Sequence, residues 1–335
     1  MRIFFDERQL AHAPEKELHD SAFEPHAEHP GRARNVVAAL GTVEAPADHG
    51  DVAIRAVHCP DYLAFLGTAW SEWRASGRSG DAMGYVWPIA CRRPLPLDRI
   101  DAKFGRYSFD ATTPITEASW ESAYWAAQCA LSALDAVRGG DPAAFALCRP
   151  PGHHAGRDYL GGYCYLNNAA IAAQGALASG AKRIAILDVD YHHGNGSQDI
   201  FWQRGDVLFV SIHADPRTDY PFFWGHANET GDGEGIGATI NLPLPRGTAW
   251  RDYEAALDDA LARIATFAPD MMVVSYGADT FAGDPISCFA LETSDYPAMG
   301  QRIAGLGIPA VIVMEGGYAV DALGANVAAF LEGFA

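Results

Sequence analysis

Residues 182–196, with the sequence KRIAILDVDYHHGNG, join a short apolar run to a dense group of side chains that bind metals. The run is rich in branched residues, which predicts a strand buried on both faces of a parallel sheet. Four titratable side chains follow it, namely Asp188, Asp190, His192 and His193. Because side chains alternate along a strand, we expect Asp188, Asp190 and His192 to share one face. Carboxylate and imidazole donors at the end of a strand favour a divalent transition metal.

An ordinary loop is the alternative interpretation of this stretch. Asp and Asn often cap helices, and loop histidines are often solvated, which would explain one or two such residues. Four titratable residues within six positions are harder to explain in this way. Further polar groups elsewhere in the chain are needed to decide.

Such groups follow three other predicted strands. The turn RPPGHH is stiffened by proline and presents His153 and His154 side by side. Asp279 follows a strand in the segment GAD, and Tyr318 follows the last strand in EGGY. Since the carboxyl ends of parallel strands meet at one sheet edge, we predict one active site there, with Asp279 as the third metal ligand.

Predicted strands and helices alternate along the whole chain, which indicates an α/β fold with a parallel sheet. No linker divides the sequence, so we expect a single domain over residues 1–335. Residues 76–116 interrupt the alternation with Gly and Pro, and a loop of this length is often functional.

Composition narrows the function further. The formal net charge of −18 argues against nucleic acid as a partner and favours cationic or neutral small substrates. The six cysteines have no C-x-x-C spacing, which argues against a disulfide framework and fits a reducing cytoplasm. We expect no membrane association, because the N-terminal apolar stretch is too short and charged for a signal peptide and no run is long enough to cross a bilayer.

Five motifs, RPPGHH, GYCYLNN, LDVDYHHGNG, GADT and EGGY, occur in an order that closely resembles the zinc-dependent histone deacetylase superfamily. The resemblance covers most of the chain. It implies an arginase/deacetylase-like fold, with three αβα layers and a central, mostly parallel sheet of about eight strands. The segment DPIS at 284–287, the sequence HHGN and the insertion at 76–116 are most similar to bacterial acetylpolyamine amidohydrolases.

The resemblance implies two metal sites. Catalytic Zn²⁺ would be bound by Asp190, His192 and Asp279. Fe²⁺ is possible in its place, because this donor set accepts both ions. Structural K⁺ would be bound by Asp188, Asp190, the backbone of His192, Ser211 and the backbone of Ile212.

The resemblance also implies catalytic roles. His153, oriented by Asp188, and His154 would supply acid/base catalysis, and Tyr318 would donate a hydrogen bond to the oxyanion. Many relatives carry Asp where this chain has Asn195. A neutral partner stabilises an imidazolium less than a carboxylate does, so we expect His154 to be the more readily neutral histidine and the better base.

The expected reaction is hydrolysis of the acetyl amide of N-acetylated polyamines or diamines. By resemblance, Gly162, Tyr163 and Tyr220 would line the substrate channel. The insertion would help to form a homodimer that admits slim cationic chains, and Asp101 could meet a distal ammonium. We would expect a second acidic residue in the insertion, and this chain has Thr112 at that position.

Three alternatives remain at this point. A protein-lysine deacetylase would differ only in access to the channel. A ureohydrolase of the arginase type would need ligands for two manganese ions, whereas we find one set of three. A pocket that merely senses acylated amines would require a broken catalytic set, and these motifs are intact.

Overall fold

A sheet of seven parallel strands runs through the molecule in the order β1-β4-β9-β8-β5-β6-β7. The computed structural model describes residues 1–19, 22–89 and 96–335. The strands of this sheet are β1 (Arg2–Phe4), β4 (Ala143–Ala146), β5 (Ile184–Asp188), β6 (Val207–Ala214), β7 (Thr239–Leu244), β8 (Met271–Tyr276) and β9 (Ala310–Met314). The predicted α/β fold is confirmed, with seven strands in this sheet instead of about eight. Two further strands, β2 (Lys16–His19) and β3 (Ala22–Pro25), pair apart from it as an antiparallel hairpin.

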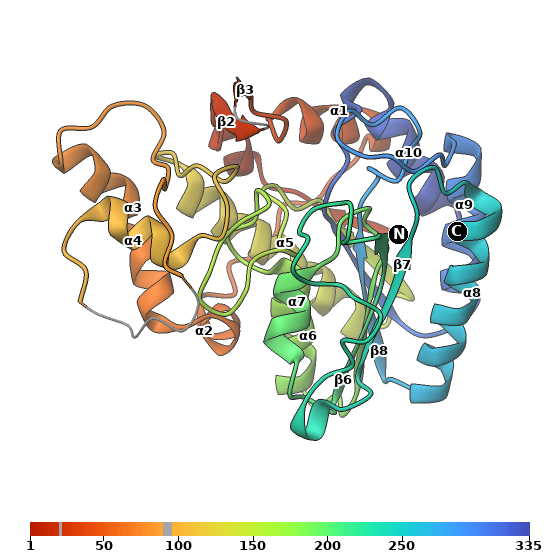
Figure 1. The fold of residues 1–335 in the computed structure, drawn as a ribbon. Helices are drawn as coiled ribbons and strands as arrows, with labels where there is room; N and C mark the ends of the chain where they lie inside the picture. The colour runs from red at the N-terminus through yellow and green to blue at the C-terminus, as the bar shows by residue number, and fades with distance from the viewer. Residues whose placement is uncertain (20–21, 90–95) are drawn as a thin grey trace.

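Helices cover both faces of the sheet, which gives the three predicted layers (Figure 1). One face carries α5 (Ser119–Arg138) and α6 (Asn168–Ala178). The other face carries α1 (Gly31–Leu40), α8 (Trp250–Phe267), α9 (Tyr296–Ala304) and α10 (Val320–Glu332). Strands β5, β6, β8 and β9 are buried along their whole length, because both of their faces are covered.

The remaining described helices are α2 (Val52–Val57), α3 (Pro60–Ala75), α4 (Ile100–Tyr107) and α7 (Asn195–Phe201), with short 3₁₀ turns at η1 (Glu7–Ala11), η2 (Gly233–Gly235) and η3 (Thr293–Asp295). None of the helices in the described ranges is both long enough and apolar enough to cross a membrane.

The insertion at 76–116 is more ordered than a simple loop. Helix α4 lies within it and packs with α3 to the side of the sheet (Figure 1). Phe104 meets Phe65 edge to face, with ring centroids 5.2 Å apart. Gly105, which weakens the helical pattern in the sequence, is needed because a Cβ there would lie 1.8 Å from the Val86 carbonyl oxygen. Residues 90–95 of the predicted insertion lie outside the described residues.

A buried cluster of charges ties the N-terminal segment to the strand ends. Arg149 is 1% exposed, lies 2.8 Å from Glu28, and donates to the carbonyl oxygens of Gln9 and His12 at 2.6 Å each. Arg32 pairs with the same Glu28 at 3.0 Å. Burial alone would raise the pKa of Glu28, but the two guanidinium groups outweigh it and lower the pKa to about 2.

Removing one partner of this cluster should cost much more than removing a surface charge. We expect Arg149→Met to lower the free energy of unfolding by about 3–5 kcal/mol, because Glu28 would be left buried without enough positive charge. Arg55→Met is the control, since Arg55 pairs with Asp51 at 2.6 Å on the surface, where such pairs contribute about 0–1 kcal/mol. Urea unfolding of both variants measures the difference. Equal losses would show that the buried cluster has no special role.

Candidate active site

The metal-binding motif is shaped by a turn and not by a continued strand. β5 ends at Asp188, yet the expected alternation of side chains holds beyond it, because Val189 and Tyr191 pack in the core whereas Asp190 and His192 face Asp279. The N–H of Asp190 donates to Asp188 Oδ1 at 3.2 Å, and the N–H of His192 donates to Asp190 Oδ1 at 2.8 Å. Each Asp side chain thereby fixes the backbone two residues further on.

This turn brings together the three predicted ligands of the catalytic metal. Asp190, His192 and Asp279 each offer an atom, and these atoms all lie within 4.8 Å of one another. His192 Nδ1 is 3.0 Å from Asp279 Oδ2 and 3.4 Å from Asp190 Oδ1. Asp279 follows β8, which pairs with β5 in the sheet. Two carboxylates and one imidazole are a suitable donor set for a divalent cation.

The electrostatics of these side chains also fit a cation. Burial and the neighbouring Asp190 carboxylate raise the pKa of Asp279 to about 7. Burial would lower the pKa of His192, but Asp190 and Asp279 raise it to about 10. Buried acids held against each other in this way mark a place where positive charge is needed.

Two glycines let the backbone approach this site. A Cβ on Gly277 would lie 1.9 Å from Asp190 Oδ2, and a Cβ on Gly316 would lie 2.5 Å from Asp279 Oδ2. The N–H of Gly316 donates to Asp190 Oδ2 at 2.8 Å. Both glycines therefore set the positions of the two carboxylates.

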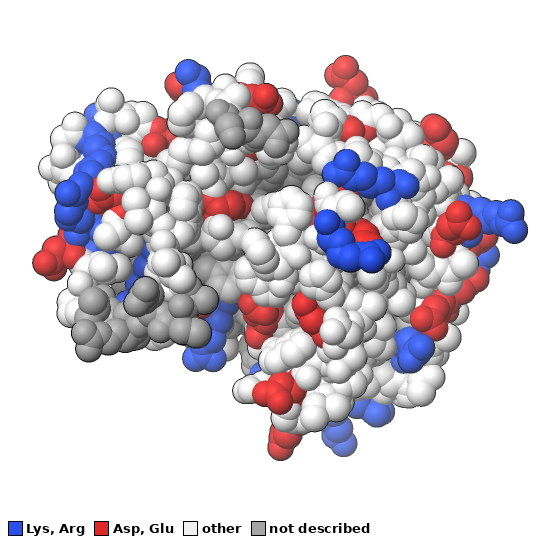
Figure 2. All heavy atoms as spheres, viewed as in Figure 1, with Lys and Arg blue, Asp and Glu red and all other residues white. Residues whose placement is uncertain are grey.

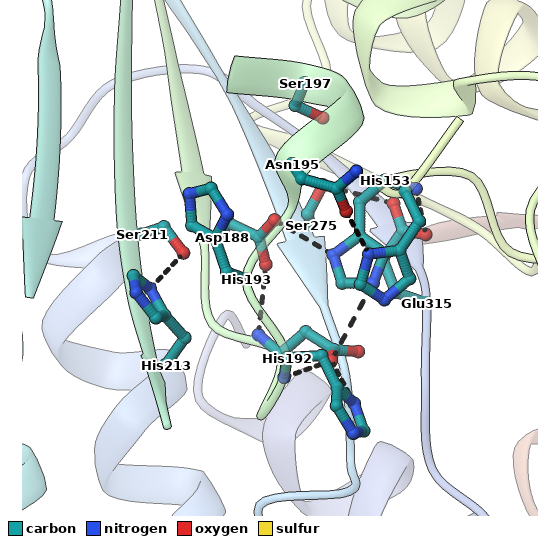
Figure 3. Close-up of polar contacts among 12 residues, drawn as sticks. His153, Asp188, His192, His193, Asn195, Ser197, Ser211, His213, Ser275 and Glu315 are labelled. Atoms are coloured by element: carbon teal, nitrogen blue, oxygen red, sulfur yellow. Dashed lines mark hydrogen bonds and ion pairs between the residues drawn. The ribbon is translucent and has the colours of Figure 1, made fainter. Parts of the chain in front are cut away.

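The paired histidines lie beside the predicted metal ligands, with ring centroids 4.0 Å apart. His153 Nδ1 lies 3.1 Å from Asp188 Oδ2 (Figure 3). His154 Nδ1 lies 2.6 Å from Asn195 Oδ1 at the start of α7. The prediction that Asp188 faces His153 and Asn195 faces His154 agrees with these contacts.

The pKa values of the two histidines move in opposite directions. Burial would lower the pKa of His153, but Asp190 and Asp188 outweigh it and raise the pKa to about 10. Burial lowers the pKa of His154, and the nearby His153 and His192 lower it further. His154 is the more readily neutral histidine, as expected, although burial and not Asn195 is the first cause.

Glu315 holds the histidine loop, a role that the sequence did not reveal. Its Oε2 accepts the N–H groups of Gly152 at 2.7 Å and His153 at 3.1 Å, and its Oε1 accepts from Ser275 at 3.1 Å (Figure 3). Glu315, His153 and Cys164 form a second group of close donor atoms. That group suits a metal poorly, because burial raises the pKa of the Cys164 thiol and Glu315 is already occupied by three donors.

Tyr318 is placed by Asp284, another residue whose role was missed. Asp284 Oδ2 accepts the N–H of Tyr318 at 2.6 Å and that of Ala319 at 3.1 Å. Burial raises the pKa of Tyr318 despite the Arg32 guanidinium 4.7 Å from its ring, so the phenol keeps its proton. From the sequence, the segment DPIS at 284–287 indicated only the subfamily. In the structure its Asp284 positions Tyr318.

A cavity of about 340 Å³ opens over these groups, a size suited to a small ligand. Its lining includes His154, His192, Tyr318, Gly162, Tyr163 and Tyr220. Asp110 supports two of these positions, because its Oδ2 accepts the Gly162 N–H at 2.7 Å and the Tyr220 hydroxyl at 2.8 Å. The predicted lining residues are therefore brought together.

Asp101 is the predicted site residue that the structure does not bring to this cavity. It lies in α4, where Arg99 approaches at 2.7 Å, Arg78 at 3.1 Å and the Tyr85 hydroxyl at 3.0 Å. Within one chain these partners occupy its carboxylate, and the expected contact with a substrate ammonium stays a prediction. The sequence did carry a signal, because Arg99 is only two residues away.

Three of the residues expected to bind potassium lie on neighbouring strands, Asp188 on β5 and Ser211 and Ile212 on β6, and Asp190 and His192 follow in the turn after β5. β5 and β6 are paired so that Asp188 stands opposite Ser211. The Ser211 hydroxyl is 2.8 Å from His213 Nδ1, and Ile212 lies between these two residues in the sequence (Figure 3). Occupation of this place by K⁺ stays a prediction.

Comparison with known proteins gives the family. The sequence model of the histone deacetylase domain matches residues 26–334. The chain belongs to the histone deacetylase family. Its motif resemblance to that superfamily is therefore confirmed, and the chain is a hydrolase of a metal-dependent family.

Relatives of this family member are similar over their full length. Acetylpolyamine amidohydrolase 1 of Pseudomonas aeruginosa is 50% identical, covering 100% of this chain and 98% of the relative. Acetylpolyamine amidohydrolase of Mycoplana ramosa is 48% identical, covering 100% of both chains. The crystal structure of acetylpolyamine aminohydrolase from Burkholderia pseudomallei superposes with a TM-score of 0.96 at 44% identity, covering 100% of this chain and 98% of that chain.

A methyl group at position 277 should disturb the metal ligands directly. We expect Gly277→Ala to weaken metal binding about 10- to 100-fold, the range seen when support of a ligand is lost. Gly67→Ala in α3 is the control, because a Cβ there meets no atom within 4 Å. Metal content after dialysis, measured by mass spectrometry, reports the difference. Retention of metal equal to that of the control would contradict the assignment of Asp190 as a ligand.

Proposed function

We propose that this chain hydrolyses the acetyl amide of N-acetylated polyamines or diamines and releases acetate and the free amine. It would act as one catalytic domain over residues 1–335. The observation that carries this proposal is the full-length identity of 45–50% with four proteins named acetylpolyamine amidohydrolase. The convergence of the metal-binding, histidine and tyrosine side chains on one cavity supports it.

We assign Asp190, His192 and Asp279 as the ligands of Zn²⁺, with Fe²⁺ possible at the same atoms. When bound, this ion would polarise the amide carbonyl and lower the pKa of a water molecule to about 7. We further assign a structural K⁺ to Asp188, Asp190 and Ser211 with the backbone of His192 and Ile212. The register of β5 and β6 supports that assignment.

The side chains around the metal site then divide the proton transfers. His154 has its Nδ1 directed at Asn195, which leaves Nε2 to accept the proton of the attacking water. His153, facing the Asp188 carboxylate, is held positive and stabilises the developing negative charge. Tyr318 donates its hydroxyl proton in a hydrogen bond to the carbonyl oxygen. The histidine that gained a proton delivers it to the leaving amine.

Substrate choice is proposed from the shape and charge around the cavity. Aromatic walls at Tyr163 and Tyr220 suit a slim alkyl chain better than a folded protein. Figure 2 shows basic side chains in separate small groups on the viewed face, without a continuous basic surface, and the net charge of −18 favours cationic amines. We propose that the insertion at 76–116 forms a homodimer, in which a rearranged Asp101 would meet a distal ammonium.

Two secondary proposals complete the assignment. Deacetylation of lysine side chains in peptides is the alternative activity, supported by the structure of the HDA15 HD domain, with a TM-score of 0.79 at 30% identity. A cytoplasmic location fits the described cysteines, all of which are free thiols.

A substrate panel tests the proposed function. We expect kcat/KM for acetylputrescine to exceed that for an acetyl-lysine peptide by about tenfold or more, since a difference of about 1.4 kcal/mol in transition-state binding gives a factor of ten. Chelation should abolish both activities, and Zn²⁺ should restore them. Equal or faster hydrolysis of the peptide would favour the alternative activity.

Removal of the Tyr318 hydroxyl tests the oxyanion contact. We expect Tyr318→Phe to lower kcat by about 10²–10³-fold while metal content stays unchanged, because one donor to the developing charge is lost. Tyr124→Phe is a suitable control, since Tyr124 donates to Asp48 at 2.5 Å on the surface of α5, outside the cavity. Full activity of the Tyr318 variant would show that the phenol has no catalytic role.

A further inference from the structure

A chain of polar contacts continues behind His154 to the protein surface. His154 Nδ1 meets Asn195 Oδ1 at 2.6 Å, and Asn195 Nδ2 donates to the Tyr159 hydroxyl at 3.4 Å. The Tyr159 hydroxyl in turn donates to Asp199 Oδ2 at 2.6 Å. Neither Tyr159 nor Asp199 lines the cavity or has a role in the proposed reaction.

An asparagine beside a histidine leaves the direction of their hydrogen bond open. The side-chain amide of Asn195 carries an acceptor oxygen and a donor nitrogen of nearly the same shape. If the amide were turned over, its nitrogen would face His154 Nδ1, which would then have to accept. The proton of neutral His154 would move to Nε2, and that nitrogen could no longer take a proton from water.

Tyr159 removes this ambiguity. Burial raises the pKa of Asp199 to about 6, so above that pH its carboxylate accepts only and the single hydroxyl proton of Tyr159 is directed at it, at 2.6 Å. The backbone oxygen of Asn195 lies 3.4 Å away and is a weaker acceptor than this charged group. Burial and Asp199 raise the pKa of Tyr159, so the phenol keeps its proton. Its oxygen can therefore only accept from Asn195, and a reversed amide would set two oxygens against each other.

The ring of Tyr159 is held in this position by its surroundings. A Cβ on Gly156 would lie 2.3 Å from the ring, so only glycine at this position lets the ring pack against the backbone. The N–H of Gly156 donates to the Tyr159 carbonyl oxygen at 3.0 Å. The ring also meets Phe109 edge to face, with centroids 5.6 Å apart.

We propose that Tyr159 and Asp199 are positioning residues that fix the amide of Asn195 and thereby hold neutral His154 with its proton on Nδ1 and a bare Nε2. A carboxylate at position 195 would not need to be held in one orientation, because either of its oxygens can accept the Nδ1–H of His154. The consequence for rate rests on the proposed role of His154 as the base, whereas the position of the proton does not.

A double-mutant cycle separates positioning from a general structural effect. We expect Tyr159→Phe to lower kcat on acetylputrescine about three- to tenfold, the effect of one ordinary hydrogen bond, with KM changed less than about twofold. In an Asn195→Asp background the same Tyr159→Phe substitution should change kcat less than about twofold. Tyr124→Phe, which breaks a similar Tyr–Asp contact outside the cavity, should leave kcat unchanged.

The position of the proton on His154 can also be measured without an activity assay. In metal-free, ¹⁵N-histidine-labelled protein above pH 7, long-range ¹H–¹⁵N spectra should show His154 as the Nδ1–H tautomer, assigned by its loss in His154→Asn. In Tyr159→Phe we expect a mixture with the Nε2–H tautomer. Metal-free Tyr124→Phe should keep the spectrum of the unchanged protein.

Two results would overturn the proposal. One is a Tyr159→Phe protein in which His154 keeps the pure Nδ1–H tautomer. The other is a loss of kcat of equal size whether or not Asn195→Asp is also present, which would indicate a structural defect. If the unchanged protein failed to hydrolyse acetylputrescine, the proposed substrate would fail, while the tautomer spectra would still decide the role of Tyr159.

Discussion

The confinement of two buried carboxylates beside one imidazole is the constraint on which this structure depends. Asp190 and Asp279 are fully buried, and each lies within 3.4 Å of His192 Nδ1. Atoms of the two carboxylates lie within 4.8 Å of each other. Two negative charges this close in a protein interior repel strongly unless positive charge or hydrogen-bond donors compensate them. The chain provides both, through His192 and His153 and through backbone N–H groups from residues 191, 192 and 316.

The loops that carry these donors are themselves anchored by buried charge. Glu315 holds the histidine loop through two backbone N–H groups, and Arg32 donates to the carbonyl oxygens of Glu315 and Gly317 at 2.6 Å each. Arg32 also pairs with Glu28, which in turn pairs with Arg149 next to the histidine loop. One connected set of ion pairs and hydrogen bonds therefore joins the histidines, the proposed metal ligands and the phenol, which explains how segments so distant in sequence keep a common geometry.

Much of the site could be predicted because its chemistry is local in sequence. The proposed ligands Asp190 and His192 stand two residues apart, and the two histidines are adjacent, so residue type and order were enough to single them out. The role of Glu315 could not be found in this way, because it acts on backbone groups 163 residues away. The pairing of Asp101 with Arg99 was overlooked although the two residues are only two positions apart, because the charge of the arginine was not considered. In the fold, α4 was not predicted within the insertion because Gly105 weakens the local helical pattern, while packing against α3 stabilises the helix.

One oxygen of Asp110 accepts hydrogen bonds from both Gly162 and Tyr220, and it thereby couples the positions of two residues that line the channel. A change in one wall alone would leave that oxygen with a donor missing, so channel width is constrained jointly and not residue by residue. Evolution or design toward bulkier amines would therefore have to begin at position 110 and its neighbours, with the wall residues adapting afterwards.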